Sequence, residues 1–157
     1  MKYVDGDLIE LAKQDKFDLI AHGCNCFNTM GAGIAKRIKE EFEDAYNADK
    51  RTISGDINKL GNYSESFVSN HNTWGKLKVI NCYTQYHYGK NHIDGSEKPI
   101  DYEALTLCMR KINHNYKGKK IGLPKIGAGL AGGDWNVIAK IIERELKDLD
   151  VTVVCFK

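Results

Sequence analysis

The 157-residue sequence contains only two prolines, and no Pro- or Ser-rich linker divides it. Because domains cluster near ~100–150 residues, we expect one domain over residues 1–157. No apolar run approaches the ~20 residues of a membrane span, and the N-terminal MKYVDGDLIEL carries acidic residues where a signal peptide needs apolar ones. These absences favour a cytoplasmic protein that does not enter a membrane.

An excess of one charge and paired metal ligands are also missing. Lys and Arg number 23 against 21 Asp and Glu, and the net charge of +2 is too small to favour a nucleic-acid partner. The five cysteines are an odd number, and the segment from His22 to Cys26 has no second C-x-x-C or H-x-x-x-H pair with which to hold zinc. We therefore expect reduced thiols, no metal and no cofactor.

Short apolar segments alternate along the chain with amphipathic stretches. This alternation predicts an α/β fold with a largely parallel or mixed sheet. A polar loop over residues 90–98 is the best candidate for a mobile segment. Strands are expected at 2–4, 17–21, 67–69, 78–83, 121–124 and 151–156, and helices at 8–13, 34–42, 102–116 and 135–149.

Glycine is concentrated in two loops, and each lies between an expected strand and an expected helix. The first glycine loop covers residues 23–33 and the second covers residues 126–133. Backbone N–H groups at a helix N-terminus, with few side chains in the way, suit an anion such as phosphate. Ligands of α/β sheets bind beyond the carboxyl ends of the strands, where both loops are expected. Neither loop matches a Walker A or dinucleotide-binding motif, but together they indicate a pyrophosphate ligand, or a phosphate with a ribose nearby.

These segments resemble the macrodomains, a family of α/β/α modules that bind ADP-ribose. The resemblance covers nearly the whole chain and implies a three-layer α/β/α fold around a central mixed sheet. The segment Val4-Asp-Gly-Asp7-Leu8 is similar to the first-strand motif of the family. It implies that Asp7 accepts a hydrogen bond from the adenine amino group, with the Leu8 backbone beside it. From the residues alone, Asp7 could equally form a turn after Gly6.

The two glycine loops carry the rest of the resemblance. In the first, Asn25 matches a family residue that orients the distal ribose, and His22 replaces the Asn that usually precedes it. From the residues alone, Asn25 could instead stabilise its own loop by Asx bonding. The second loop resembles the pyrophosphate-binding loop of the family. The implied ligand-binding residues are Asp7, Leu8, Asn25, Met30, Gly31, Ala32, Gly33, Ile34, Thr84, Ile126, Gly127, Ala128, Gly129, Leu130 and Ala131.

The sequence looks most like the macrodomain branch that hydrolyses ADP-ribose-1''-phosphate. A neighbouring branch removes ADP-ribose from protein glutamate or from DNA with a Lys at the end of the mid-sheet strand, where this chain has Gln85. An amide can neither form a Schiff base nor carry positive charge, although Lys90 or Lys98 could swing in. The departure favours the phosphatase. A mono-ADP-ribosyl hydrolase and a non-catalytic ADP-ribose reader remain as alternatives.

Two residues are candidates for the phosphatase chemistry, which needs an activated water or a nucleophile, and a proton donor. Asp134, where the second loop meets its helix, could activate water or attack phosphorus, although Asp is also a preferred helix N-cap. His22 titrates near neutral pH and could donate a proton to the leaving sugar oxygen, although a strand-end histidine can simply be hydrogen-bonded in the core. We predict a monomeric, metal-independent phosphatase of ADP-ribose-1''-phosphate.

Overall fold

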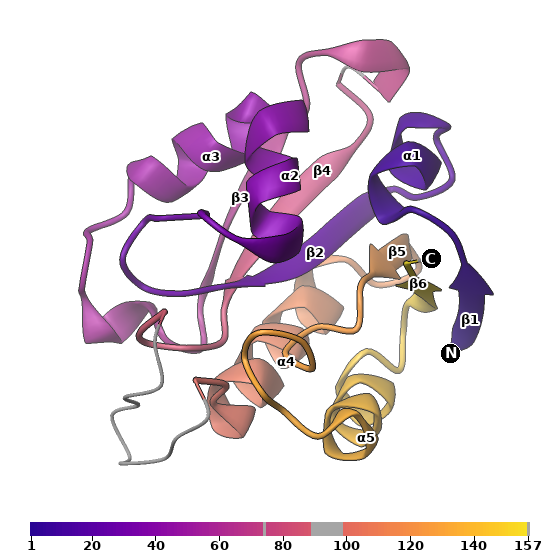
Figure 1. The fold of residues 1–157 in the computed structure, drawn as a ribbon. Coiled ribbons are helices and arrows are strands. Elements are labelled where there is room, and N and C mark those ends of the chain that lie inside the picture. The colour runs from indigo at the N-terminus through magenta and orange to yellow at the C-terminus, as the bar shows by residue number, and fades with distance from the viewer. Residues whose placement is uncertain (74, 89–98, 157) are drawn as a thin grey trace.

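The computed structural model describes residues 1–73, 75–88 and 99–156 (Figure 1). Within these ranges, six strands form one sheet in the order β1-β6-β5-β2-β4-β3. All neighbouring strands run parallel except β3, which is antiparallel to β4, so the sheet is mixed as predicted. The strands are β1 (Lys2–Asp5), β2 (Leu19–Cys24), β3 (Tyr63–Phe67), β4 (Lys78–Tyr83), β5 (Lys120–Leu123) and β6 (Asp150–Cys155).

Helices cover both faces of the sheet. Figure 1 shows α1, α2 and α3 on one face and α4 and α5 on the other, which confirms the predicted three-layer α/β/α fold. The helices are α1 (Leu8–Lys13), α2 (Gly33–Glu41), α3 (Glu43–Lys50), α4 (Tyr102–Asn115) and α5 (Trp135–Glu145), with short 3-10 turns η1 (Ile57–Lys59) and η2 (His71–Thr73).

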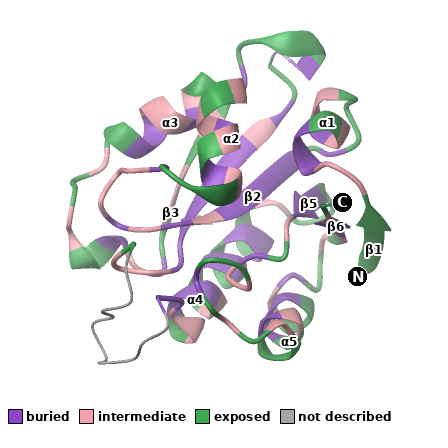
Figure 2. Ribbon diagram, viewed as in Figure 1, coloured by how far each residue is buried: buried purple, intermediate pink, exposed green. Residues whose placement is uncertain are grey.

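The central strands are buried on both faces, so neighbouring residues in one strand belong to different cores. Ile20 of β2 and Val79 of β4 pack with α1–α3, whereas Ala21 and Ile80 pack with α4 and α5. Figure 2 shows β2 largely buried through the middle of the molecule and β1 exposed at the edge. The two cores fix the carboxyl ends of β2, β4 and β5 side by side.

Helix α3 is the main element that the apolar pattern does not predict. Two of its buried residues, Ala45 and Ala48, are alanines, which let the helix backbone lie close to β3 and β4. Its third buried residue is the carboxylate Asp49. A stripe of two alanines and an aspartate carries no hydrophobic periodicity, so the helix leaves little trace in the sequence.

Other boundaries differ by a few residues. Strand β3 ends at Phe67, where the expected strand 67–69 begins. The backbone N–H and the hydroxyl of Ser69 donate instead to the Asp44 carboxylate. Helix α5 ends at Glu145, before the expected residue 149. All five cysteines are free thiols, four of them buried. No helix within the described ranges is long and apolar enough to span a bilayer. The expected mobile loop, with Lys90 and Lys98, lies outside the described residues.

Candidate functional site

A cavity of about 510 Å³ lies at the carboxyl ends of β2, β4 and β5. This volume falls within the range of about 300–1,000 Å³ that is typical of small-molecule sites. Both glycine loops border it, which places the two predicted anion-binding segments on one site. The predicted ligand-binding residues that line it are Asn25, Met30, Gly31, Ala32, Gly33, Ile34, Thr84, Ile126, Gly127, Gly129, Leu130 and Ala131.

The first glycine loop ends in a helix whose N-terminus is open. The N-cap of α2 is Ala32, whose methyl side chain cannot accept a hydrogen bond from the N–H groups of the first turn. Gly33 begins the helix at a φ of +58°, a conformation that favours glycine. A β-carbon at Gly33 would lie 3.6 Å from Leu130 Cδ1 of the second loop. These free N–H groups border the cavity and suit an anion.

A buried lysine outside the first loop holds that loop in place. Lys59 Nζ donates to the carbonyl oxygens of Cys26 at 2.9 Å and Ile53 at 3.0 Å, and to Asn28 Oδ1 at 2.5 Å. Asn28 has a φ of +59°, which is uncommon for a residue with a side chain. The three hydrogen bonds offset the free-energy cost of burying the ammonium group, and they fix the loop backbone beside the cavity.

Asn25 serves both the loop and the cavity. Its Nδ2 donates to Thr29 Oγ1 at 2.7 Å, and its Oδ1 accepts from the Phe27 N–H at 2.8 Å. The Phe27 contact is an Asx turn, the structural role that the residues alone suggested. Because Asn25 also lines the cavity, its role toward a ribose stays a prediction.

The Thr84 hydroxyl is an unpaired polar group at the cavity. Thr84 follows β4, is 1% exposed, and its Oγ1 forms no hydrogen bond with any described residue. Buried polar atoms in folded proteins are nearly always paired, so a bound ligand or water is the natural partner of this hydroxyl. A β-carbon at Gly23 would lie 2.8 Å from Thr84 Oγ1, which explains why glycine stands beside it.

Some residues that line the cavity were not singled out from the sequence: Thr29, Asp49, Tyr88 and Lys125. Lys125 directly precedes the second glycine loop, and a cation beside an expected phosphate loop was a usable signal. Asp49 had no such signal, because its helix was not predicted. Gln85, at the position expected for the Lys of the hydrolase branch, also lines the cavity.

His22 does not reach the cavity, contrary to the expected proton-donor role. Its ring is fully buried, and Nε2–H donates to Asn81 Oδ1 at 2.7 Å. Burial lowers the pKa of His22 to about 4, and the hydrogen bond to Asn81 only partly opposes this effect. The ring is therefore neutral at neutral pH and takes the core position that was the alternative interpretation.

Asp134 caps a helix and does not line the cavity. Its Oδ1 accepts from the Asn136 N–H at 2.9 Å, and its own backbone N–H donates to the Tyr102 hydroxyl at 2.9 Å. The structure thus shows the N-cap that was the alternative to a catalytic role. Unlike α2, helix α5 has a first turn that is closed by a side chain.

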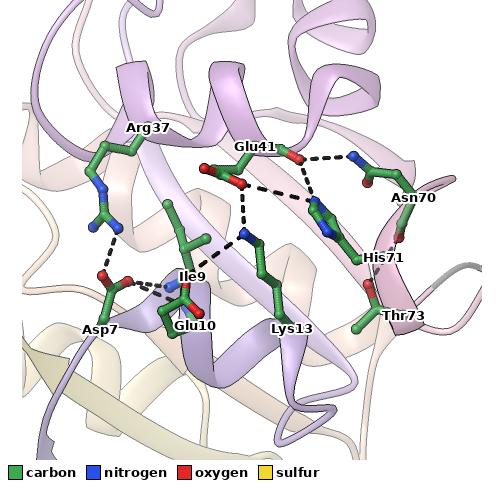
Figure 3. A network of polar contacts seen from close by, with 9 residues as sticks. All are labelled: Asp7, Ile9, Glu10, Lys13, Arg37, Glu41, Asn70, His71 and Thr73. Carbon is green, nitrogen blue, oxygen red and sulfur yellow. Dashed lines mark hydrogen bonds and ion pairs between the residues drawn. The ribbon is translucent and has the colours of Figure 1, made fainter.

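Asp7 also lies outside the cavity lining, together with Leu8 and Ala128. Figure 3 shows the Asp7 carboxylate at the start of α1, where it caps the helix and forms a 2.6 Å ion pair with Arg37 of α2. Burial raises the pKa of Asp7, but Arg37 and the capping N–H groups outweigh it and hold the pKa below its usual value. The Arg37 guanidinium also lies 5.2 Å from the ring centroid of the exposed Phe156.

Together, the layered sheet and the two-loop cavity define an α/β/α ligand-binding module with an open helix N-terminus. The chain belongs to the Macro domain family, whose model matches residues 21–142.

Relatives and solved structures agree with this assignment. The chain is 37% identical to an uncharacterized 17.5 kDa protein from the tk–vs intergenic region of Enterobacteria phage T4, over 98% of this chain and 95% of that protein. It is 28% identical to an ADP-ribose 1''-phosphate phosphatase of Debaryomyces hansenii, over 92% and 93%. It shares its fold with Thermosipho africanus DarTG in complex with ADP-ribose, at a TM-score of 0.71 and 18% identity, over 99% of this chain and 41% of that one.

Proposed function

We propose that this macrodomain binds ADP-ribose and releases phosphate from ADP-ribose-1''-phosphate. The observation that carries the proposal is the pairing, in one cavity, of the open α2 N-terminus with the unpaired Thr84 hydroxyl. The first suits a pyrophosphate and the second suits a sugar hydroxyl or phosphoryl oxygen. The name of the Debaryomyces relative supports phosphate release, and the ligand of the Thermosipho structure supports the binding of ADP-ribose.

The cavity residues divide along such a ligand. The open turn of α2 and the second loop would hold the pyrophosphate, and Lys125 would add positive charge beside it. Asn25 and Thr84, after β2 and β4, would face the distal ribose. Outside the cavity lining, Asp7 would accept from the adenine amino group while sharing its carboxylate with Arg37.

Gln85 favours the phosphatase over removal of ADP-ribose from an acceptor. Its side chain stands at the cavity where the hydrolase branch would place an amine nucleophile, and an amide cannot attack the sugar carbon. Attack of water on phosphorus needs no amine; it needs N–H donors for the phosphoryl oxygens, which the loops supply. His22 and Asp134 take no part in this proposal, because His22 is fully buried against Asn81 and the Asp134 carboxylate caps its own helix.

The function is tested by calorimetry and a phosphate-release assay on the wild-type protein. ADP-ribose should bind more tightly than AMP, because AMP lacks the second phosphate and the distal ribose. ADP-ribose-1''-phosphate should yield inorganic phosphate. Loss of label from an ADP-ribosylated acceptor without phosphate release would favour the hydrolase, and binding without either reaction would favour the reader.

A pair of substitutions tests the observation itself. Thr84→Val removes the unpaired hydroxyl and should weaken ADP-ribose binding about 3- to 10-fold, the value of one hydrogen bond, without loss of stability. Ser66→Ala is the matched control, because Ser66 Oγ is also buried and unpaired among the described residues but does not line the cavity. Equal affinities of both variants and the wild type would contradict the assignment of Thr84.

A further inference from the structure

Asp49 of α3 brings a carboxylate to the cavity. Among the described residues that line the cavity, Asp49 is the single Asp or Glu, and it is 1% exposed. Placing a carboxylate on the buried face of a helix costs free energy unless its oxygens are used. The other buried residues of α3, Ala45 and Ala48, are small and apolar, so Asp49 is the exception on that face.

One oxygen of Asp49 is bound by the protein and the other is not. Oδ1 accepts from the Tyr83 hydroxyl at 2.7 Å, and that hydroxyl also lies 2.8 Å from Ser64 Oγ. Among the described residues, the Asp49 carboxylate accepts a hydrogen bond only at Oδ1, which leaves Oδ2 available. Since Asp49 lines the cavity, a ligand or water there is the partner available to Oδ2.

The surroundings of Asp49 make it a better proton acceptor than a surface aspartate. Burial raises its pKa, while the Tyr83 hydrogen bond and the Lys59 charge oppose the rise. The titratable groups that interact with it are Tyr83 of β4, Lys59 of η1, Cys24 of β2 and, in the first glycine loop, Cys26. The Lys59 ammonium lies 4.9 Å from the Tyr83 ring centroid and partly balances the buried negative charge.

Asp49 lines the cavity and is linked to the strand ends that carry the residues proposed for the distal ribose. Tyr83, its hydrogen-bond donor, directly precedes Thr84. Cys24 directly precedes Asn25, and the Asp49 charge adds to burial in raising the pKa of the Cys24 thiol. The carboxylate is thus bound to the residue before Thr84 and acts electrostatically on the residue before Asn25.

We propose that the Asp49 carboxylate is the proton acceptor at the distal end of the cavity, where it contacts the ribose end of ADP-ribose and activates the water that attacks phosphorus. This inference rests on the proposed function. In the reaction, the water oxygen forms a bond to phosphorus as the bond between phosphorus and the sugar oxygen breaks. The electron pair of the broken bond stays on the sugar oxygen. Asp49 takes a proton from the water and passes it to the sugar oxygen, so the carboxylate is restored.

Two variants separate this role from a structural one. Asp49→Asn keeps the shape and an oxygen for the Tyr83 hydroxyl, but it cannot take a proton; kcat for phosphate release should fall at least ~100-fold. Tyr83→Phe removes the hydrogen bond from the Tyr83 hydroxyl but keeps the carboxylate, so kcat should change less than about tenfold. The wild-type kcat should fall as pH drops through the Asp49 pKa, because protonation removes the proton acceptor. This fall in kcat at low pH should be absent in Asp49→Asn.

Each other outcome overturns a defined part. Wild-type turnover in Asp49→Asn, or equal losses in both variants, would overturn the role of Asp49 and leave the proposed function standing. If Asp49→Asn does not fold, a wild-type kcat that does not fall as the solution is made acidic overturns the role of Asp49. If the wild type releases no phosphate, the proposed function fails, and binding affinities then test the contact between Asp49 and the ribose. Asp49→Asn should weaken the binding of ADP-ribose but not that of AMP. Unchanged affinity for both ligands overturns the contact.

Discussion

The two glycine loops share the sequence Gly-Ala-Gly, yet they lead into helices whose N-termini differ. The first leads into α2, whose N-cap Ala32 leaves the first turn open. The second leads into α5, whose N-cap Asp134 closes the first turn with its own carboxylate. One side chain at the N-cap thus decides whether a strand, glycine loop and helix form an anion site at the helix end or only at the loop.

The loops also differ in what supports them. The second loop bonds to itself, through Gly133 N–H to the Gly127 carbonyl at 2.8 Å and Gly132 N–H to the Gly129 carbonyl at 3.0 Å. The first is held from outside by Lys59. The second loop thus has backbone bonds of its own, whereas the backbone of the first takes support from a lysine outside the loop.

The largest effect is expected from a charge placed at the open helix end. Gly33→Glu should weaken ADP-ribose binding about 1,000-fold or more, because like charges brought together cost several kcal/mol. Gly118→Glu is the matched control: its φ of +81° imposes similar strain, and no atom lies within 4 Å of its β-carbon. Calorimetry on both folded variants checks this comparison. Comparable affinities in the two variants would remove the α2 N-terminus from the binding site.

The next effect concerns His22, which precedes the first loop. The unfolded chain binds a proton at the ordinary pKa of 6.5 and the folded chain only at about 4, so acid favours unfolding. Stability should therefore fall by about 3 kcal/mol as pH drops from 6.5 to 4, and His22→Gln should lack this component. Urea unfolding at several pH values measures it. The same pH dependence in both proteins would place His22 in solvent.

The smallest effect is expected at the closed helix end. Asp134→Ala should cost about 1 kcal/mol of stability through loss of the α5 cap, and Asp134→Ser should restore it. ADP-ribose affinity and phosphate release should change less than about twofold in both variants, as for substitutions away from a site. Thermal unfolding and the phosphate assay check this. Phosphate release lost in both variants would return Asp134 to the mechanism.

Sequence reasoning succeeded where the signal is local. Residues 8–13 form α1 over the predicted range, and all strands except β3, which shares only residue 67 with its expected segment, follow short apolar runs with small shifts in their ends. Glycine at 33 and 127 stands at positive φ, which the turn chemistry required. The family resemblance also identified most of the residues that line the cavity, because each of the two loops is a continuous segment of the sequence.

The sequence by itself determined the alternation of strands and helices and the place of both glycine loops, because apolar periodicity and glycine conformation act over a few neighbouring residues. Only the tertiary structure decided which charged groups meet the cavity. His22 lies against Asn81 in the core, and Asp134 turns back onto its own helix. Asp49 reaches the cavity because two alanines bring α3 close to the sheet, and no local pattern encodes that approach.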